Sequence, residues 1–252
     1  MPEDLIFELG TEELPQSSIL EAIEYLNANI PSVLSGLNIE FESFELYCGP
    51  RRIAVYIRKL AEFSTGIEKY VKGPSFDISY DTEGKPTKAL MGFLRTNSAG
   101  NNDIVIDDTG KTKYIFIKKM EDGKPVSESV PQALSSLMMS IPFTKMMRWG
   151  SGDFKFSRIR WVLAVYGEEL LRAEIGDVKS DKYTFGHRFL SPGQHELKSA
   201  EEYLGLLKKN YVIADRDERA EIIRKQISDI ECKYGLKALL EEDVFEEVVD
   251  MV

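Results

Sequence analysis

The sequence predicts an α+β fold with antiparallel or mixed sheets, packed helices and a C-terminal part that is all-helical. Three observations predict this class. The 252 residues are 43% hydrophobic and 10% aromatic, which is enough for a sizeable core and excludes a disordered chain. Apolar residues alternate along several short segments of the first three quarters of the chain, as they do in strands. From 199 to 252 they recur every three or four residues, which is typical of helices.

Residues 1–60 are expected to form a βαββ unit. The apolar run LIFEL near the N-terminus is typical of a buried strand. A helix is expected next, with Ser17 or Ser18 as its N-cap and Pro31 at its end, because the apolar residues between them recur at helical spacing. Two alternating segments flank a Cys-Gly-Pro turn at 48–50 and predict an antiparallel hairpin.

Residues 61–141 are predicted to form an inserted or second α+β subdomain. The segment opens with a turn-rich link and contains a short helix that begins near Pro86. The apolar segments 104–106 and 114–117 are separated by polar turn residues and predict a hairpin. A second helix is expected to end at Pro142, where apolar residues at helical spacing stop.

Residues 142–195 are expected to pack with residues 1–60 as one α+β body. Their apolar segments 161–165, 170–175 and 182–189 predict strands of a second sheet. Residues 196–252 are expected to be the start of a helical domain that is truncated, because the last amphipathic helix ends on apolar residues without a cap.

The net charge of −10 conceals an uneven distribution of charge along the chain. Residues 1–50 contain ten acidic residues and no lysine or arginine, whereas residues 51–200 contain 24 basic and 18 acidic residues. Attraction of an anion depends on the local field and not on the sum over the chain. The middle of the chain is therefore the part suited to an anionic partner, and the acidic first 50 residues are expected to face solvent or a protein.

Cysteine content and hydropathy restrict the compartment in which we expect the protein. The two cysteines, Cys48 and Cys232, have neither the number nor the spacing of a disulfide framework or a zinc site. The acidic N-terminus is unlike a signal peptide, and the chain has no apolar run of membrane-spanning length. We expect a cytoplasmic protein that does not interact with membranes.

The acidic cluster of Glu8, Glu12 and Glu13 is the first candidate for chemistry. Carboxylates at a strand-to-helix junction can hold a metal or act as general acid and base. They also interact favourably with the positive end of a helix, and this structural interpretation is favoured because no histidine or aspartate constellation accompanies them. For His187 we likewise favour a structural corner. The glycine-rich loops that hold nucleotide phosphates are absent, so no catalytic residue and no metal site are assigned.

Basic residues of the middle segment suggest contacts with RNA. Guanidinium groups beside a hairpin turn and next to tryptophans suit phosphate binding and base stacking, although an arginine next to a buried tryptophan is as often a packing contact. The candidate phosphate contacts are Arg51, Arg52, Lys69, Lys72, Arg148, Arg158, Arg160 and Arg188.

A series of motifs occurs in order along the chain and resembles one known family. The motifs are LIFELGTEELP (5–15), GPRRIAV (49–55), KGP (72–74), Ala89 with Gly92-Phe93, MRW (147–149), Thr184 with GHRF (186–189), AEEYL (200–204) and DER (217–219). Together they resemble the β subunit of the bacterial two-subunit glycyl-tRNA synthetases. The family's Arg-Pro-Ile-Arg-Trp motif lacks its proline here, which leaves open whether Arg158 or Arg160 faces solvent.

The resemblance implies the N-terminal portion of a longer, non-catalytic subunit of glycine–tRNA ligase. Such a subunit is expected to contribute to tRNA binding and to assemble with the catalytic α subunit as α2β2, for ATP-dependent glycylation of glycine tRNA in translation. ATP and Mg²⁺ are expected at the α subunit, no cofactor is expected in this chain, and the isolated fragment is expected to be inactive. One alternative is a docking module for the α subunit without RNA contacts. Another is a stand-alone hydrolase that uses Glu8, Glu12 and His187.

Overall fold

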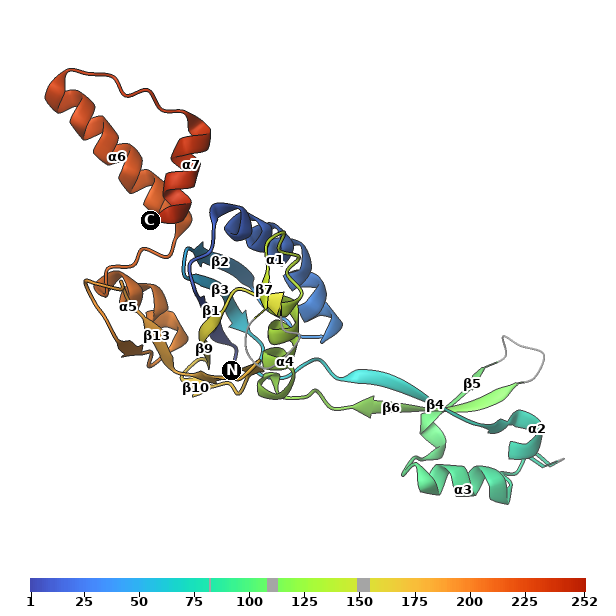
Figure 1. Cartoon of the computed structure of the whole chain (residues 1–252). Helices are drawn as coiled ribbons and strands as arrows, with labels where there is room; N and C mark the ends of the chain where they lie inside the picture. The colour runs from blue at the N-terminus through green and yellow to red at the C-terminus, as the bar shows by residue number, and fades with distance from the viewer. Residues whose placement is uncertain (82, 108–112, 149–154) are drawn as a thin grey trace. The chain divides into compact units, whose positions relative to one another are not determined.

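The computed structural model describes residues 1–81, 83–107, 113–148 and 155–252, and it confirms the predicted α+β class. The described chain divides into two compact units (Figure 1). The larger unit comprises residues 1–64 and 125–252, and the smaller unit comprises residues 65–124. The smaller unit is thus shorter than the predicted segment 61–141, because the helix that follows residue 125 packs in the core of the larger unit.

A seven-stranded sheet forms the centre of the larger unit. Its strand order is β11-β12-β9-β1-β3-β2, with β10 paired to β9. The strands are β1 (Glu3–Thr11), β2 (Ser43–Gly49), β3 (Arg52–Leu60), β9 (Ile159–Tyr166), β10 (Glu169–Leu170), β11 (Glu174–Ile175) and β12 (Val178–Asp181). Strand β1 is antiparallel to both β3 and β9. The prediction that 161–165 and 170–175 belong to a second sheet was therefore wrong, since β9, β10 and β11 extend the first sheet. The third predicted segment, 182–189, does contain a strand of a separate sheet, which is described below.

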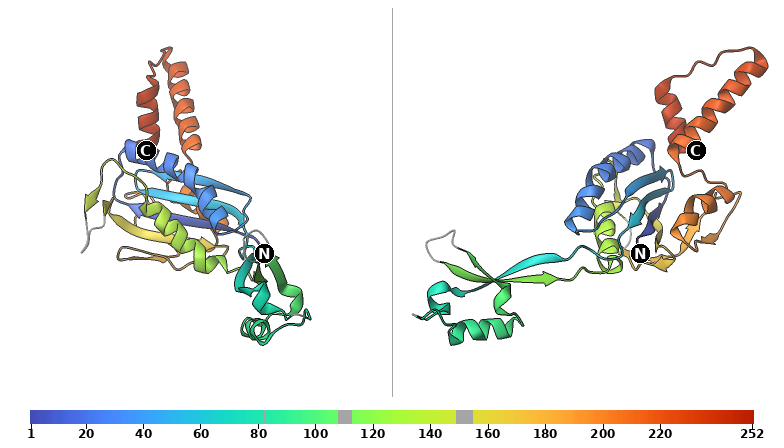
Figure 2. Two further views of the ribbon diagram at one scale, coloured as in Figure 1. Left: turned by 90° about the vertical axis from the view of Figure 1, so that its right-hand side faces the viewer. Right: turned by 180° about the vertical axis from the view of Figure 1, so that it is seen from behind.

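Helices α1 (Gln16–Gly36) and α4 (Val126–Met139) pack on one face of this sheet (Figure 2). Contrary to the sequence prediction, Pro31 lies inside α1, and the N-cap is Pro15 instead of a serine. A proline inside a helix removes one hydrogen bond. That cost is offset here because Ile30 and Leu34, on either side of Pro31, are both fully buried against the sheet.

The opposite face of the sheet is covered by the segment after residue 182. The hairpin β13 (Tyr183–Phe185) and β14 (Gln194–Glu196) leads through the 3-10 turn η2 (Ala200–Glu202) into α5 (Tyr203–Lys209). Tyr203, the largest fully buried side chain, packs here against Ile6 and Val165 of the sheet. Residues that follow 196 therefore complete the core of the larger unit. The helical domain that was predicted to start at 196 is thus not separate from the larger unit at its beginning.

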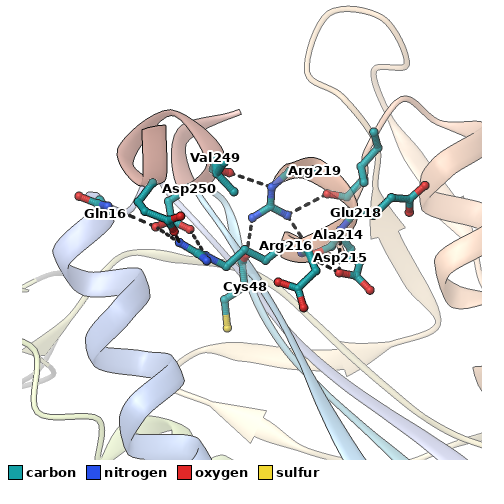
Figure 3. Close-up of polar contacts among 12 residues, drawn as sticks. Gln16, Cys48, Ala214, Asp215, Arg216, Glu218, Arg219, Val249 and Asp250 are labelled. Atoms are coloured by element: carbon teal, nitrogen blue, oxygen red, sulfur yellow. Dashed lines mark hydrogen bonds and ion pairs between the residues drawn. The ribbon is translucent and has the colours of Figure 1, made fainter. Parts of the chain in front are cut away.

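Helices α6 (Arg216–Tyr234) and α7 (Glu242–Met251) form a pair that is tied to the sheet by Arg219 (Figure 3). The buried guanidinium donates hydrogen bonds to the carbonyl oxygens of Val249 (2.9 Å), Ile213 (2.9 Å), Ala214 (3.0 Å) and Cys48 (3.1 Å). One side chain thus joins α6, α7 and the end of β2.

Asp250 fixes the other side of the same pair. Its buried carboxylate accepts hydrogen bonds from Nε (2.7 Å) and Nη2 (3.2 Å) of Arg216 on α6, and from Gln16 on α1 (3.3 Å) (Figure 3). The ion pair with Arg216 and the hydrogen bond from Gln16 hold α7 between α6 and the first turn of α1.

The smaller unit is a three-stranded antiparallel sheet with short helices. Strands β4 (Ile67–Ser75), β6 (Tyr114–Glu121) and β5 (Ile104–Asp107) lie in this order, so the predicted hairpin is confirmed as β5 and β6. Helix α2 (Phe76–Ser79), helix α3 (Lys88–Thr96) and the 3-10 turn η1 (Asn101–Asp103) complete it. Its core contains Leu90, Leu94, Ile115 and Ile117. A further two-stranded pair, β7 (Met147–Arg148) and β8 (Lys155–Phe156), belongs to the larger unit.

None of the helices within the described ranges combines the length and apolar character needed to cross a membrane.

Gly10 on β1 provides a test of the sheet packing. A methyl group at this position would lie 1.9 Å from ring atoms of Trp161. We expect Gly10→Ala to destabilise the chain by about 3 kcal/mol or more, since the indole cannot retreat without leaving the core. Gly36→Ala is the matched control: nothing lies within 4 Å of its added methyl group. Urea unfolding monitored by circular dichroism compares the two, and equal stability of both variants would contradict the packing described.

Arg219→Met tests the attachment of the helix pair. Four backbone carbonyls would lose their charged donor, so amide hydrogen exchange in α6 and α7 should accelerate at least about tenfold while that of β1 and β3 stays unchanged. Arg224→Met is the control, because Arg224 bonds Glu242 of α7 at the exposed surface. Unchanged exchange in Arg219→Met would show that other contacts hold the pair to the sheet.

Candidate nucleic-acid interface

The buried carboxylate of Glu8 lies beneath the predicted interface and organises it. Its Oε1 accepts hydrogen bonds from Thr184 Oγ1 (2.7 Å) and from Trp161 Nε1. Its Oε2 accepts from Arg52 Nη1 (3.1 Å) and from the hydroxyl of Tyr203. Glu8 is fully buried, so both oxygens of this carboxylate are occupied by the four donors.

Arg52 belongs to this network and is therefore corrected from a phosphate contact to a structural residue. It is 6% exposed, and its Nη2 donates to the carbonyl oxygen of Phe185 (2.6 Å). Its guanidinium lies 5.9 Å from the ring centroid of Trp161. Arg52 is the first residue of β3, and its side chain points into the protein. There it forms an ion pair with Glu8, which is buried on the neighbouring strand β1.

Glu12 and Glu13 pair with arginines of the predicted set. Glu12 lies 3.3 Å from Arg160, and Glu13 lies 3.2 Å from Arg188. Glu12 and Glu13 precede the first turn of α1, which contains no acidic residue, so their interaction with the positive end of this helix stays a prediction. Glu13 is exposed and Glu12 is half-buried, so both carboxylates pair with arginines while still reaching solvent, the side that the acidic first 50 residues were expected to face. Among the described residues, no group of three or more metal-binding side chains occurs.

Arg51 occupies the centre of the exposed basic surface. It lies at the turn between β2 and β3, where its Nε is buried and has no hydrogen-bond partner within the described chain. Burial lowers the pKa of Arg51, and the neighbouring charge of Arg188 lowers it further. A positive charge held in this way is stabilised when an anion comes within hydrogen-bond distance.

Arg51 lines two adjoining clefts. The larger cleft has a volume of about 560 Å³, and its lining includes Arg51, Arg188, Phe189, Tyr211, Leu14 and Ile222. The smaller cleft has a volume of about 490 Å³, and its lining includes Arg51, Arg158, Arg160 and Asp177. Both clefts lie within the larger unit.

The missing proline does not hide either arginine of the segment Arg158–Trp161. Arg158 and Arg160 are both exposed, and Ile159 between them is buried. Both arginines line the smaller cleft. In the described part of the chain Arg158 makes no ion pair, whereas Arg160 is paired with Glu12.

The remaining predicted contacts lie elsewhere. Lys69 and Lys72 are on β4 of the smaller unit. There Nζ of Lys69 lies 3.0 Å from a carboxylate oxygen of Glu121, and Nζ of Lys72 lies 3.7 Å from the ring centroid of Tyr114. Arg148 is exposed on β7 and is not among the described residues that line either cleft. Its neighbour in the motif, Trp149, lies outside the described residues.

His187 shapes the turn beside Arg188. Its Nδ1 accepts hydrogen bonds from the backbone N–H groups of Phe189 (3.2 Å) and Leu190 (3.1 Å), as expected for a structural corner. The backbone N–H of His187 donates to the carbonyl oxygen of Asn210 (2.9 Å). This bond holds the turn in which Tyr211 follows α5, and Tyr211 lines the larger cleft. The sequence analysis missed Tyr211, because its left-handed backbone conformation (φ 61°) follows no local pattern.

Comparison with known proteins gives one consistent family. A family model described as glycyl-tRNA synthetase beta subunit matches residues 5–252. The curated relatives include glycine–tRNA ligase beta subunits of Desulforamulus reducens (34% identity), Halothermothrix orenii (36%) and Moorella thermoacetica (34%). Each alignment covers 100% of this chain and 36% of the relative. The chain therefore spans about 36% of the length of these relatives.

Glu8→Gln tests the role of the buried network. The substitution keeps the shape of the side chain but leaves Arg52 buried without a countercharge and turns an amide N–H₂ toward other donors. We expect a loss of about 3–5 kcal/mol of unfolding free energy, measured by urea denaturation. Glu45→Gln is the control, because Glu45 pairs with Arg58 near the surface (2.7 Å), and its loss should cost about 1 kcal/mol or less. Equal losses in both variants would contradict this role of Glu8.

Proposed function

Because the chain belongs to the glycyl-tRNA synthetase β-subunit family, we propose that it binds glycine tRNA and assembles with a catalytic α subunit, as part of an α2β2 glycine–tRNA ligase. The observation that carries the RNA contact is the surface around Arg51. Four arginines, Arg51, Arg158, Arg160 and Arg188, surround two adjoining clefts there.

The charges of this surface support a phosphate-binding role. Two of the four arginines are paired with Glu12 and Glu13, and these are exposed pairs that contribute little and exchange readily. Arg51 and Arg158 have no acidic partner within hydrogen-bond distance in the described chain. The phosphates of RNA would complete the hydrogen bonds of these guanidinium groups and release bound counterions.

Catalysis is proposed to lie on the α subunit, where ATP and Mg²⁺ would bind. Within the described chain, the carboxylate of Glu8 is enclosed by its four donors and Nδ1 of His187 is occupied by backbone N–H groups. Glu12, the third member of the hydrolase alternative, is paired with Arg160. These contacts disfavour the hydrolase alternative.

A second candidate function is a docking module for the α subunit without RNA contacts. It is favoured by large apolar side chains that are exposed along α6, α7 and their connection, including Tyr234, Leu236, Leu239 and Val244. Contiguous exposed apolar residues are typical of protein interfaces. The two candidates differ in the expected effect of salt.

The salt dependence of tRNA binding tests the RNA contact. We expect the chain to bind glycine tRNA with an affinity that falls steeply as the salt concentration rises, because binding releases counterions. Arg51→Ala and Arg158→Ala should each weaken binding and reduce the slope of log K against log[salt] by about 1. Filter binding or fluorescence anisotropy over a salt series provides the measurement.

Lys237→Ala supplies the matched control, since it removes one exposed positive charge from the connection between α6 and α7. It should leave both affinity and slope unchanged. Absence of tRNA binding at low salt, together with retained association with the α subunit, would support the docking module and exclude the RNA contact.

A further inference from the structure

We propose that the larger cleft binds unpaired nucleotides of the RNA, with bases stacked on Phe189 and Tyr211 and the adjoining phosphates bound by Arg51 and Arg188. This inference rests on the proposed function and goes further, because it specifies single-stranded RNA as the ligand of one particular cleft. It is carried by three features of the cleft: its exposed aromatic rings, its rigid walls and its charge.

The two aromatic side chains are exposed at the cleft. Phe189 is 80% exposed and Tyr211 is 62% exposed, and both line the larger cleft. An aromatic ring that remains in water lacks the favourable free energy that its burial would contribute. Their faces are well suited to stacking on bases, an interaction that is worth about 1–3 kcal/mol for each base and requires that the base be unpaired.

Hydrogen bonds and close packing join the two turns that carry these rings. The turn with Phe189 is bonded to the turn with Tyr211 through Asn210, whose Oδ1 accepts from Ser191 Oγ (2.7 Å). Gly186 allows this approach, because an added methyl group would lie 2.8 Å from the Asn210 carbonyl oxygen. A platform that is ordered before binding loses less conformational entropy when a base stacks on it.

The charge of the cleft favours nucleic acid over an apolar peptide. The charge of Arg188 contributes to lowering the pKa of Arg51, and the acidic residue that lines the same cleft within the described chain is Glu13. Two guanidinium groups beside two aromatic rings match the alternation of phosphate and base along a single strand. The cleft volume of about 560 Å³ lies in the range of small-ligand sites, which suits one or two nucleotides.

Three RNA ligands test this inference: glycine tRNA, a short single-stranded oligoadenylate and a blunt RNA duplex of the same length. We expect Phe189→Ala and Tyr211→Asn each to weaken oligoadenylate binding by about tenfold while leaving duplex affinity unchanged. Asparagine is chosen at 211 because it tolerates the left-handed backbone. Leu190→Ala is the matched control, since Leu190 is 62% exposed on the same turn but does not belong to the described lining of the cleft.

Circular dichroism and urea unfolding establish that each variant keeps its fold, and Arg51→Ala should weaken binding of all three RNAs. Wild-type binding of tRNA with unchanged oligoadenylate affinity in both aromatic variants would overturn this inference and leave the proposed function intact. Absence of tRNA binding by the wild-type chain would overturn both. Loss of α-subunit association in Phe189→Ala, with RNA affinity unchanged, would assign the cleft to a protein and also overturn the inference.

Discussion

The buried charge of Glu8 is the constraint on which the larger unit depends. Its donors come from β3, β9, β13 and α5, and the most distant of them is 195 residues away in the sequence. Moving a carboxylate out of water is costly unless each oxygen is well bonded. An arrangement that displaced one of these four segments would leave a buried charge without a donor, so the network selects one packing of the sheet against β13 and α5.

The same network determines which arginines are available at the surface. Arg51 and Arg52 are neighbours in the sequence, yet Arg52 is bound to Glu8 while Arg51 stays at the turn with a free Nε. Each strand residue points to the side opposite its neighbour, and Arg52 is the residue that reaches the buried carboxylate. Two adjacent positive charges therefore perform different tasks: one stabilises the fold, and the other maintains the positive field of both clefts.

The sequence predicted those features that depend on local pattern. The α+β class, the β2–β3 hairpin and the β5–β6 hairpin follow from alternation and turn residues within a few positions of each other. The pairing of β9 with β1 did not follow, because partners in a sheet are chosen by contacts distant in sequence. The burial of Arg52 depends on Glu8, 44 residues earlier, and the position of Tyr211 depends on hydrogen bonds across the 186–191 turn. No local pattern encodes either contact.

Arg219 has a consequence for the larger cleft. This side chain joins α6 and α7 to the carbonyl of Cys48, and it also lines the cleft. Met251 and Val252, which follow on from α7, line the same cleft. The position of the helix pair and the shape of the cleft therefore vary together. By thermodynamic reciprocity, a protein that pulled α6 away from β2 would weaken whatever occupies the cleft, and that occupant would oppose the displacement by the same free energy. Under the proposed function, contacts with another subunit and the affinity for RNA would be coupled through this helix pair.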